Sequence, residues 1–214
     1  MIKPSTCKSC QLYEIGNSYS IPFGKGTSGV IILGEALDYE GSLEGTPFPV
    51  HAQGGSKLEE CIKLAGFKRA DFLISNLVRC FPPEGRLSGY WYAAGAIAHC
   101  YRTYQKDMIE RFIPPAGKRK VILALGNASY QNLTGNFDSV SDIRGYPYSD
   151  KYGMGITIIP AIHPSFIKRG QGHLTPLLVE DIKKACTIAG QEEWIVPEGK
   201  DKDSNNKIER DIPF

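Results

Sequence analysis

Four of the six cysteines lie where their thiols could act together as metal ligands. Cys7 and Cys10 form a Cys-x-x-Cys pair near the N-terminus, a spacing that lets two sulfurs reach one metal ion or cluster. Cys80 lies next to a Pro-Pro break, and Cys100 is surrounded by polar and aromatic residues. Free cysteines are often simply buried, and the spacing alone allows either a four-cysteine zinc site or a 4Fe–4S cluster.

A second group of residues is suited to binding a flat polar ligand. The apolar run Val30–Leu33 is expected to form a buried strand, and Gly34, Glu35 and Asp38 follow it directly. The glycine- and proline-containing loop after them closes with the aromatic ring of Phe48. Because open α/β sheets bind ligands at the carboxyl ends of their strands, we expect these side chains to line a crevice.

Two polar side chains lie at the ends of other apolar runs. Asn76 belongs to the run 71–80, where a buried amide costs free energy unless it has hydrogen-bond partners. A cap on a neighbouring turn is the plainer alternative for this residue. His163 follows the run 155–162 and precedes Pro164. A lone histidine is usually structural, but a His-Pro pair at a strand end beside a crevice favours a catalytic role.

The elements that must position these residues alternate between strands and helices. Strands are expected at about 30–33, 71–80, 120–126 and 155–162, and helices at about 56–65, 90–112 and 175–189, with a short helix after residue 127. Near-continuous apolar strands separated by helices indicate a parallel sheet covered on both faces. We therefore expect an α/β fold, a three-layer α/β/α sandwich with a central, mostly parallel four-stranded sheet.

The composition fits one globular domain with a tail. Hydrophobic residues make up 42% and charged residues 22% of the 214 residues, which is ordinary for a folded domain. We expect a domain over residues 1–190, whose N-terminal segment binds the metal, and a charged, flexible tail over 191–214. Because the net charge is only +2, contact with nucleic acid would rest on a local basic patch.

The chain has no pattern typical of export or membrane insertion. No stretch approaches the roughly 18 consecutive apolar residues of a membrane span, and the first residues lack a signal-peptide core. We expect a cytoplasmic, monomeric protein with no membrane partner. Cysteines in that compartment are more often ligands or core residues than disulfides. Cys61 and Cys186 lie on apolar helix faces, which predicts that both are core residues.

Several short motifs occur along the chain in a fixed order. They are Cys7-Lys-Ser-Cys-Gln-Leu12, Gly34-Glu35-Ala36, Gly45-Thr-Pro-Phe48, Asn76-Leu-Val-Arg-Cys-Phe-Pro82, Leu123-Ala-Leu-Gly126, Arg144-Gly145 and His163-Pro164. In this order the chain, from Cys7 to about Ala189, resembles the iron–sulfur uracil-DNA glycosylases, family 4 of the uracil-DNA glycosylase superfamily. A single motif of this kind would be weak evidence for the family, whereas all of them in the same order are strong evidence.

The resemblance implies a monofunctional uracil-DNA glycosylase of base-excision repair, which flips uracil out of DNA and hydrolyses the N-glycosidic bond. It implies DNA containing uracil, single- or double-stranded, as the partner, and a place at the nucleoid. It also implies a structural 4Fe–4S cluster held by Cys7, Cys10, Cys80 and Cys100, with zinc as the alternative. The alternative function is a non-catalytic uracil- or DNA-binding module accessory to replication.

Each matched position has a role in that reaction. Phe48 would stack on the flipped base, Asn76 would match the N3–H and O4 of uracil, and His163 would donate to O2 as negative charge develops there. The predicted catalytic residues are Glu35, Asn76 and His163, and the predicted substrate-binding residues are Gly34, Ala36, Phe48, Asn76 and His163.

The stretch after His163-Pro164 resembles a minor-groove wedge. Apolar side chains inserted between base steps unstack them, and basic side chains hold the phosphates. Ile167 takes the wedge position by analogy, Phe166 can share it, and both are expected to be exposed. The predicted DNA-binding set is Ser165, Phe166, Ile167, Lys168 and Arg169, with the last two as phosphate contacts.

The loop after the first strand departs from the family pattern. Leu37-Asp38 stands where the family has Pro-Gly, and Ala36 stands where the better-known branch of the superfamily has a water-activating aspartate. Glu35, Asp38 and Glu40 are the candidates for positioning the attacking water, and the sequence does not choose among them.

Overall fold

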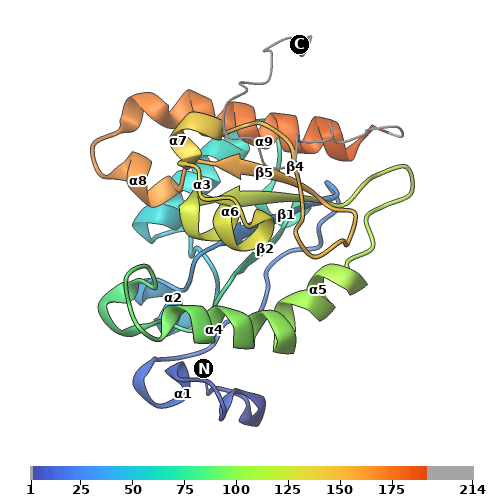
Figure 1. Ribbon diagram of the computed structural model, residues 1–214. Coiled ribbons are helices and arrows are strands. Elements are labelled where there is room, and N and C mark those ends of the chain that lie inside the picture. Colours follow the sequence, from blue (N-terminus) through green and yellow to red (C-terminus); the bar gives the residue numbers. More distant parts are fainter. Residues whose placement is uncertain (1, 192–214) are drawn as a thin grey trace.

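Within residues 2–191, five strands form the central sheet, in the spatial order β2-β1-β3-β5-β4 (Figure 1). They are β1 (Val30–Gly34), β2 (Leu73–Asn76), β3 (Val121–Leu125), β4 (Tyr148–Ser149) and β5 (Thr157–Ala161). The first four positions of this order pair in parallel, and β4 pairs antiparallel with β5. The expected fold class is confirmed with one strand more than the four expected, because β4 has two residues and no apolar run to reveal it.

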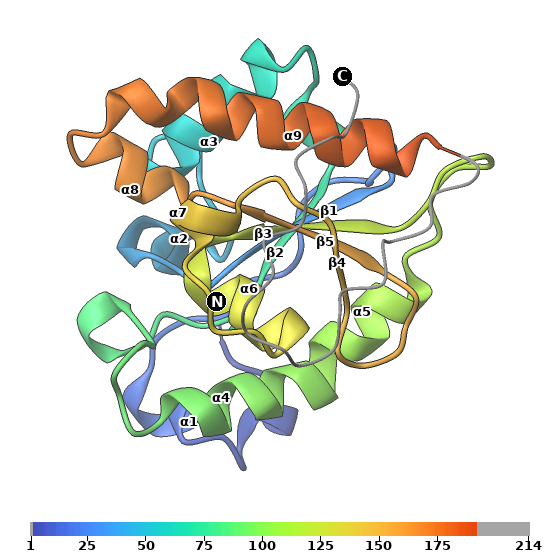
Figure 2. The ribbon, with the colours of Figure 1, turned by 45° about the horizontal axis from the view of Figure 1, so that its top comes forward.

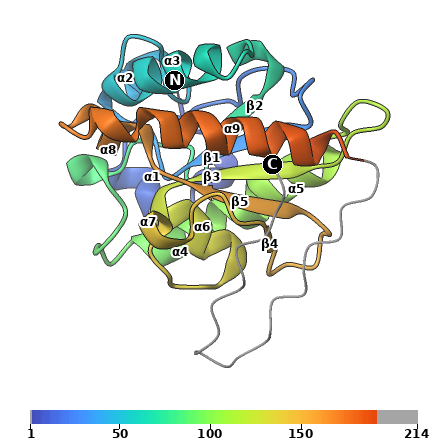
Figure 3. The same ribbon diagram turned by 90° about the horizontal axis from the view of Figure 1, so that it is seen from above.

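The computed structural model describes residues 2–191, so the predicted flexible tail lies outside the described residues apart from its first position. Helices cover both faces of the sheet, as Figures 1 and 3 show. One face packs against α3 (Gln53–Leu64), α8 (Pro164–Lys168) and α9 (Thr175–Ala189), and the other against α5 (Lys106–Arg111), α6 (Gly126–Thr134) and α7 (Val140–Ile143). No helix within residues 2–191 is long and apolar enough to cross a membrane.

The alternation of side chains along β1 explains why the sequence reads as an unbroken apolar run. Val30 and Ile32 join the core under α3 and α9, whereas Ile31 and Leu33 join the core on the opposite face. All four are fully buried. A strand covered on both faces needs apolar residues at every position, so the three-layer arrangement follows directly from this stretch.

A third apolar cluster lies beside the sheet and contains the cysteines. It joins α1 (Leu12–Ile15) to α4 (Ala93–Cys100), with Leu12, Val78 and Ala96 among its fully buried residues. Figure 2 shows α1 lying against α4, away from the sheet. The remaining short elements are α2 (Tyr39–Glu44) and 3₁₀ turns at Ser5–Cys7, Arg69–Asp71, Pro83–Gly85 and Gly172–Leu174.

Some expected boundaries were wrong. The helix expected at 90–112 consists of α4, a π turn at Tyr101–Gln105 and α5. The strand expected at 71–80 ends at Asn76, because residues 77–80 turn towards the third cluster. The loop 35–48 contains α2, whose start Asp38 marks by accepting a hydrogen bond from the Gly41 amide.

The polar segment 17–28 is attached to the body by backbone hydrogen bonds. Phe23 forms an antiparallel bridge with Ile74 of β2, through Phe23 N to Ile74 O at 2.9 Å and Ile74 N to Phe23 O at 2.7 Å. Three residues before Phe23, the Ser20 amide donates to the Arg79 carbonyl at 2.7 Å. The segment therefore runs along the outer edge of β2, and the buried ring of Tyr19 adds a contact with Tyr104.

Candidate functional site

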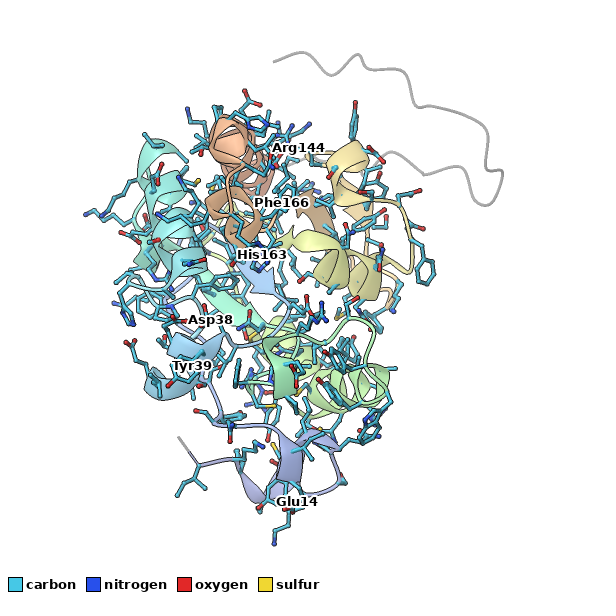
Figure 4. The ribbon with its side chains drawn as sticks, turned by 90° about the vertical axis from the view of Figure 1, so that its left-hand side faces the viewer. Glu14, Asp38, Tyr39, Arg144, His163 and Phe166 are labelled. Carbon is cyan, nitrogen blue, oxygen red and sulfur yellow. The ribbon has the colours of Figure 1, made fainter. Side chains whose placement is uncertain are left out.

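The carboxyl ends of the parallel strands bring the predicted site residues together. Gly34 ends β1 and is the register partner of Asn76, which ends β2. His163 lies two residues after β5, and its ring centroid is 5.7 Å from that of Phe48. Figure 4 looks onto this edge of the sheet, with His163 between Phe166 on one side and Asp38 on the other.

Gly34 allows two other site residues to approach the end of β1 closely. A Cβ atom added here would collide with both Asn76 Oδ1 and the Phe48 ring. Those two groups therefore pack directly against Gly34, and any side chain at position 34 would displace them. The role of Gly34 in binding substrate stays a prediction.

Asn76 has a buried amide oxygen without a partner in the described part of the chain. The residue is 1% exposed, and its Oδ1 has no hydrogen-bond partner within residues 2–191. Leaving a buried acceptor unpaired costs about 1–3 kcal/mol, and such groups in native proteins call for an explanation. A donor supplied by a bound ligand would account for it.

His163 is arranged to act as a neutral hydrogen-bond donor. Its Nδ1 accepts the Ser165 amide proton at 3.2 Å and thereby caps the start of α8. The ring proton must then reside on Nε2. Burial, aided by the charge of Arg169, lowers the pKa of His163 to about 4, so the imidazole is uncharged at neutral pH.

Phe48 is held in a costly backbone conformation. Its φ of 52° lies in the left-handed region, which is rare for a bulky residue. The Arg69 Nη2 atom donates to the carbonyls of Pro47 at 2.8 Å and Phe48 at 2.6 Å, and this fixes the loop. Sequence reasoning missed Arg69, because a contact across 21 positions leaves no local pattern.

The carboxylates after β1 have structural partners. Glu35 Oε1 accepts the amide protons of Leu87 at 2.7 Å and Ser88 at 3.3 Å, which ties the loop before α4 to the end of β1. Asp38 caps α2, and burial raises its pKa above the usual value. Ala36 is half-buried and packs against the third cluster. The catalytic role of Glu35 and the substrate-binding role of Ala36 stay predictions.

The residues expected to form a wedge fold into the short helix α8. Phe166 is 43% exposed, whereas Ile167 is 1% exposed and belongs to the core shared with α3 and α9. The expected exposure of Ile167 was therefore wrong. Successive residues of a helix point about 100° apart, so a helix that packs on the core cannot expose both. Lys168 and Arg169 are exposed, and Ser165 is half-buried beside Gly54 of α3.

All four cysteines of the predicted ligand set are buried and line one small cavity, although they come from three separate segments of the chain. Burial raises the pKa of Cys80 to about 12 and that of Cys100 to about 11. Within residues 2–191 no three metal-binding side chains are arranged around a single ion. Four buried thiols that line one cavity are a ligand set suited to either a zinc ion or an iron–sulfur cluster.

The remaining cysteines and the Arg144-Gly145 motif have structural places. Cys61 is fully buried and Cys186 packs against the same core, as predicted. Arg144 donates through Nε and Nη2 to both carboxylate oxygens of Asp181, at 2.9 and 2.7 Å. The Gly145 amide donates to the Pro160 carbonyl at 2.8 Å. The motif therefore fastens β5, the strand that leads to His163, to α9.

Comparison with known proteins agrees with this geometry. The family model described as the uracil DNA glycosylase superfamily matches residues 21–185. The type-4 uracil-DNA glycosylase of Thermotoga maritima is 30% identical over 188 residues, which cover 87% of this chain and 91% of the relative. That of Sulfurisphaera tokodaii is 29% identical over 190 residues, 86% of this chain and 80% of the relative. That of Archaeoglobus fulgidus is 25% identical over 193 residues, 88% and 90% of the two chains. With its buried Asn76 and its His163 at the carboxyl ends of two strands of one parallel sheet, the chain belongs to the uracil-DNA glycosylase superfamily, in the type-4 branch.

Proposed function

We propose that the protein is a uracil-DNA glycosylase that binds a flipped-out uracil nucleotide and hydrolyses its N-glycosidic bond. The observation that carries this proposal is the buried Oδ1 of Asn76, which has no partner within residues 2–191 and lies against Gly34 close to the Phe48 ring. A base that offers a ring N–H to this oxygen would repay its desolvation. The type-4 relatives are named for this activity.

Recognition of uracil follows from what an asparagine amide can pair with. Asn76 Oδ1 accepts the N3–H of uracil, and the amide NH2 donates to O4. Cytosine has an acceptor at N3 and an amino group at C4, so both contacts fail. The Phe48 ring stacks on the base, a contact worth about 1–3 kcal/mol.

His163 stabilises the leaving base. Cleavage of the glycosidic bond leaves negative charge on uracil, shared with O2. The Nε2–H of the neutral imidazole donates to that oxygen as the charge develops, and Nδ1 holds the ring in place through the Ser165 amide. A donor fixed before the reaction pays no cost of reorientation at the transition state.

The attack of water on the sugar needs an acceptor, for which Glu35 is the predicted residue. Its Oε1 is already engaged by the amides of Leu87 and Ser88. Glu35 would therefore act through its other oxygen, while Asp38 keeps its role as the cap of α2.

Contacts with DNA outside the pocket fall to α8. Phe166 takes the wedge role in place of Ile167, because it is the exposed apolar residue beside His163 (Figure 4). Lys168 and Arg169, both exposed, bind phosphates on either side of the flipped nucleotide. The proposed partner is DNA containing uracil, single- or double-stranded, and such a substrate would place the protein at the nucleoid.

Cys7, Cys10, Cys80 and Cys100 would hold a 4Fe–4S cluster. The cluster would supply no step of base excision and would join the N-terminal segment to the body. A colourless protein that carries zinc would support the alternative ligand.

A glycosylase assay tests the proposed function. We expect the purified protein to release uracil from a labelled oligonucleotide with one uracil, and to leave the matched thymine oligonucleotide intact. Abasic sites are read by alkaline cleavage on a gel. In the same assay Phe166→Ala should slow excision from duplex DNA more than from single strands. Binding to uracil-DNA with no base release would instead support the non-catalytic module.

The pKa of His163 predicts the pH dependence of excision. With a pKa of about 4 rather than the usual 6.5, the imidazole stays neutral down to about pH 5, so the single-turnover rate should show no step near pH 6.5. The rate should fall as the pH approaches 4, because protonation of Nδ1 removes the hydrogen bond from the Ser165 amide that holds the ring in place. Since the unfolded chain takes up this proton near 6.5, the folded state also loses stability as the pH falls from 6.5 towards 4.

The control for this profile is His163→Gln, which keeps an N–H donor that does not titrate. Its rate relative to the wild type should rise as the pH approaches 4. A step near pH 6.5 in the wild type that is absent from His163→Gln would contradict the neutral donor.

A further inference from the structure

Gln105 is a buried polar residue that the reaction itself does not use. It ends the π turn Tyr101–Gln105 and is 1% exposed. Its Nε2 donates to the backbone carbonyl of Asn76 and lies 3.4 Å from the carbonyl of Leu77. The side chain of Gln105 thus ends on the backbone of the residue that borders the pocket.

The end of β2 is held from two sides. On the side of β1, the Leu77 amide donates to the Gly34 carbonyl at 2.9 Å and the Val78 amide donates to the Glu35 carbonyl at 3.0 Å. On the other side Gln105 binds the carbonyls of residues 76 and 77. Together these bonds fix the peptide plane between Asn76 and Leu77, and with it the direction of the Asn76 Cα–Cβ bond.

The π turn brings Gln105 to this place. A π turn inserts one extra residue into a helix, and such insertions occur often at functional sites. The extra residue rotates everything that follows by about 100° relative to an unbroken α-helix. Cys100, one of the predicted cluster ligands, immediately precedes the turn, so the helix is anchored at one end of the turn and contacts Asn76 at the other.

The side chain of Gln105 affects both the stability of the fold and the backbone of Asn76. Its Oε1 is buried and has no hydrogen-bond partner within the described part of the chain. The hydrogen bonds from Nε2 to the carbonyls of Asn76 and Leu77 stabilise the fold, and the unpaired Oε1 offsets part of that gain. The more specific consequence of the side chain is that it fixes the backbone of Asn76.

We propose that Gln105 is a positioning residue that holds the Asn76 amide in the orientation needed to recognise uracil. The inference rests on the proposed role of Asn76. Gln105 lies behind the backbone of Asn76 and acts through it. A displacement of about 1 Å at a group that orients a substrate can cost 100-fold, so a small rotation of the 76–77 peptide is enough to matter.

The test uses Gln105→Met, which keeps the length of the side chain and removes the donor. Binding is measured to a single-stranded oligonucleotide carrying 2′-fluorinated deoxyuridine, which resists base loss, and to the same oligonucleotide with 2′-fluorinated deoxycytidine, which fails both contacts with Asn76. The dissociation constant for the cytosine oligonucleotide divided by that for the uracil oligonucleotide should fall by about tenfold or more in Gln105→Met. A merely structural role would lower the unfolding temperature and leave this ratio unaltered.

A double-mutant cycle separates positioning from a general effect. In the Asn76→Ala background, Gln105→Met should change the ratio by less than about twofold, because the side chain it orients is gone. The matched control is Gln131→Met on α6, where Nε2 also donates to a carbonyl, that of Phe137 at 3.4 Å. This change should leave the ratio unaltered.

Two results would overturn the inference while the proposed function stands. One is a wild-type preference for uracil that Gln105→Met leaves intact, and the other is an equal loss with and without Asn76. If Gln105→Met does not fold, Gln105→Asn makes the same prediction, because it withdraws the amide by one methylene. A wild type with no preference for uracil would overturn the proposed function itself.

Discussion

Replacing Asn76 with alanine is expected to lower the single-turnover rate of uracil excision by about 100- to 1,000-fold, the loss seen when one preorganised hydrogen-bonding group is removed. The unfolding temperature should change by no more than roughly 3 °C, which corresponds to about 1 kcal/mol for a chain of this size. Stability is spared because the lost packing is offset by removal of a buried oxygen that has no partner within residues 2–191. Gel assays and thermal unfolding measure the two quantities.

The control for this variant is Asn132→Ala. Asn132 is a half-buried asparagine on α6 whose Nδ2 donates to the Ala128 carbonyl at 2.8 Å. Its removal should cost some stability and no activity. The opposite pattern at position 76, with stability lost and the excision rate retained, would mean that Asn76 is a structural residue.

Replacing Cys80 with serine is expected to remove the cluster and with it much of the stability of the N-terminal part. A ligand present at 1,000 times its dissociation constant stabilises a fold by about 4 kcal/mol, which corresponds to roughly 8–16 °C at this chain length. The unfolding temperature should fall by about that amount. The brown colour near ~400 nm that iron–sulfur ligation gives should disappear. Absorbance and iron content are the measurements.

Cys61→Ser serves as the matched control, since Cys61 is also buried but belongs to the core under α3. It should lose some stability and keep its colour and iron. If Cys80→Ser bound as much iron as the wild type, the proposed ligand set would be wrong. A zinc-loaded wild type would instead support the alternative metal.

The layers of the fold and the centre of the site could be predicted from the sequence because each has a local cause. A strand that is buried on both faces has apolar residues at nearly every position, and β1 and β5 are such strands. Asn76 and His163 stood out because each is a polar residue where an apolar run ends. The helix α2 could also have been found, since Asp38 is a capping residue and Gly45 follows its last turn with φ of 68°.

Other features had no local cause. The burial of Ile167 depends on how α8 packs against α3 and α9, and a five-residue stretch does not encode that. Arg69 and Gln105 act across 21 and 29 positions through single side chains, so neither belongs to a periodic pattern. The two residues of β4 are too few for alternation to be visible.

The segment 17–28 has a consequence for association between molecules. An exposed sheet edge offers unpaired backbone groups to other chains, and proteins commonly blunt or cover such edges. Here the Phe23–Ile74 bridge occupies part of the outer edge of β2, and β4 covers part of the edge of β5. The chain that shields β2 begins at Cys7 and Cys10. Loss of the proposed cluster would therefore loosen this segment at its N-terminal end and expose the edge of β2 to pairing with a second molecule, so we expect aggregation as well as a lower stability in the metal-free protein.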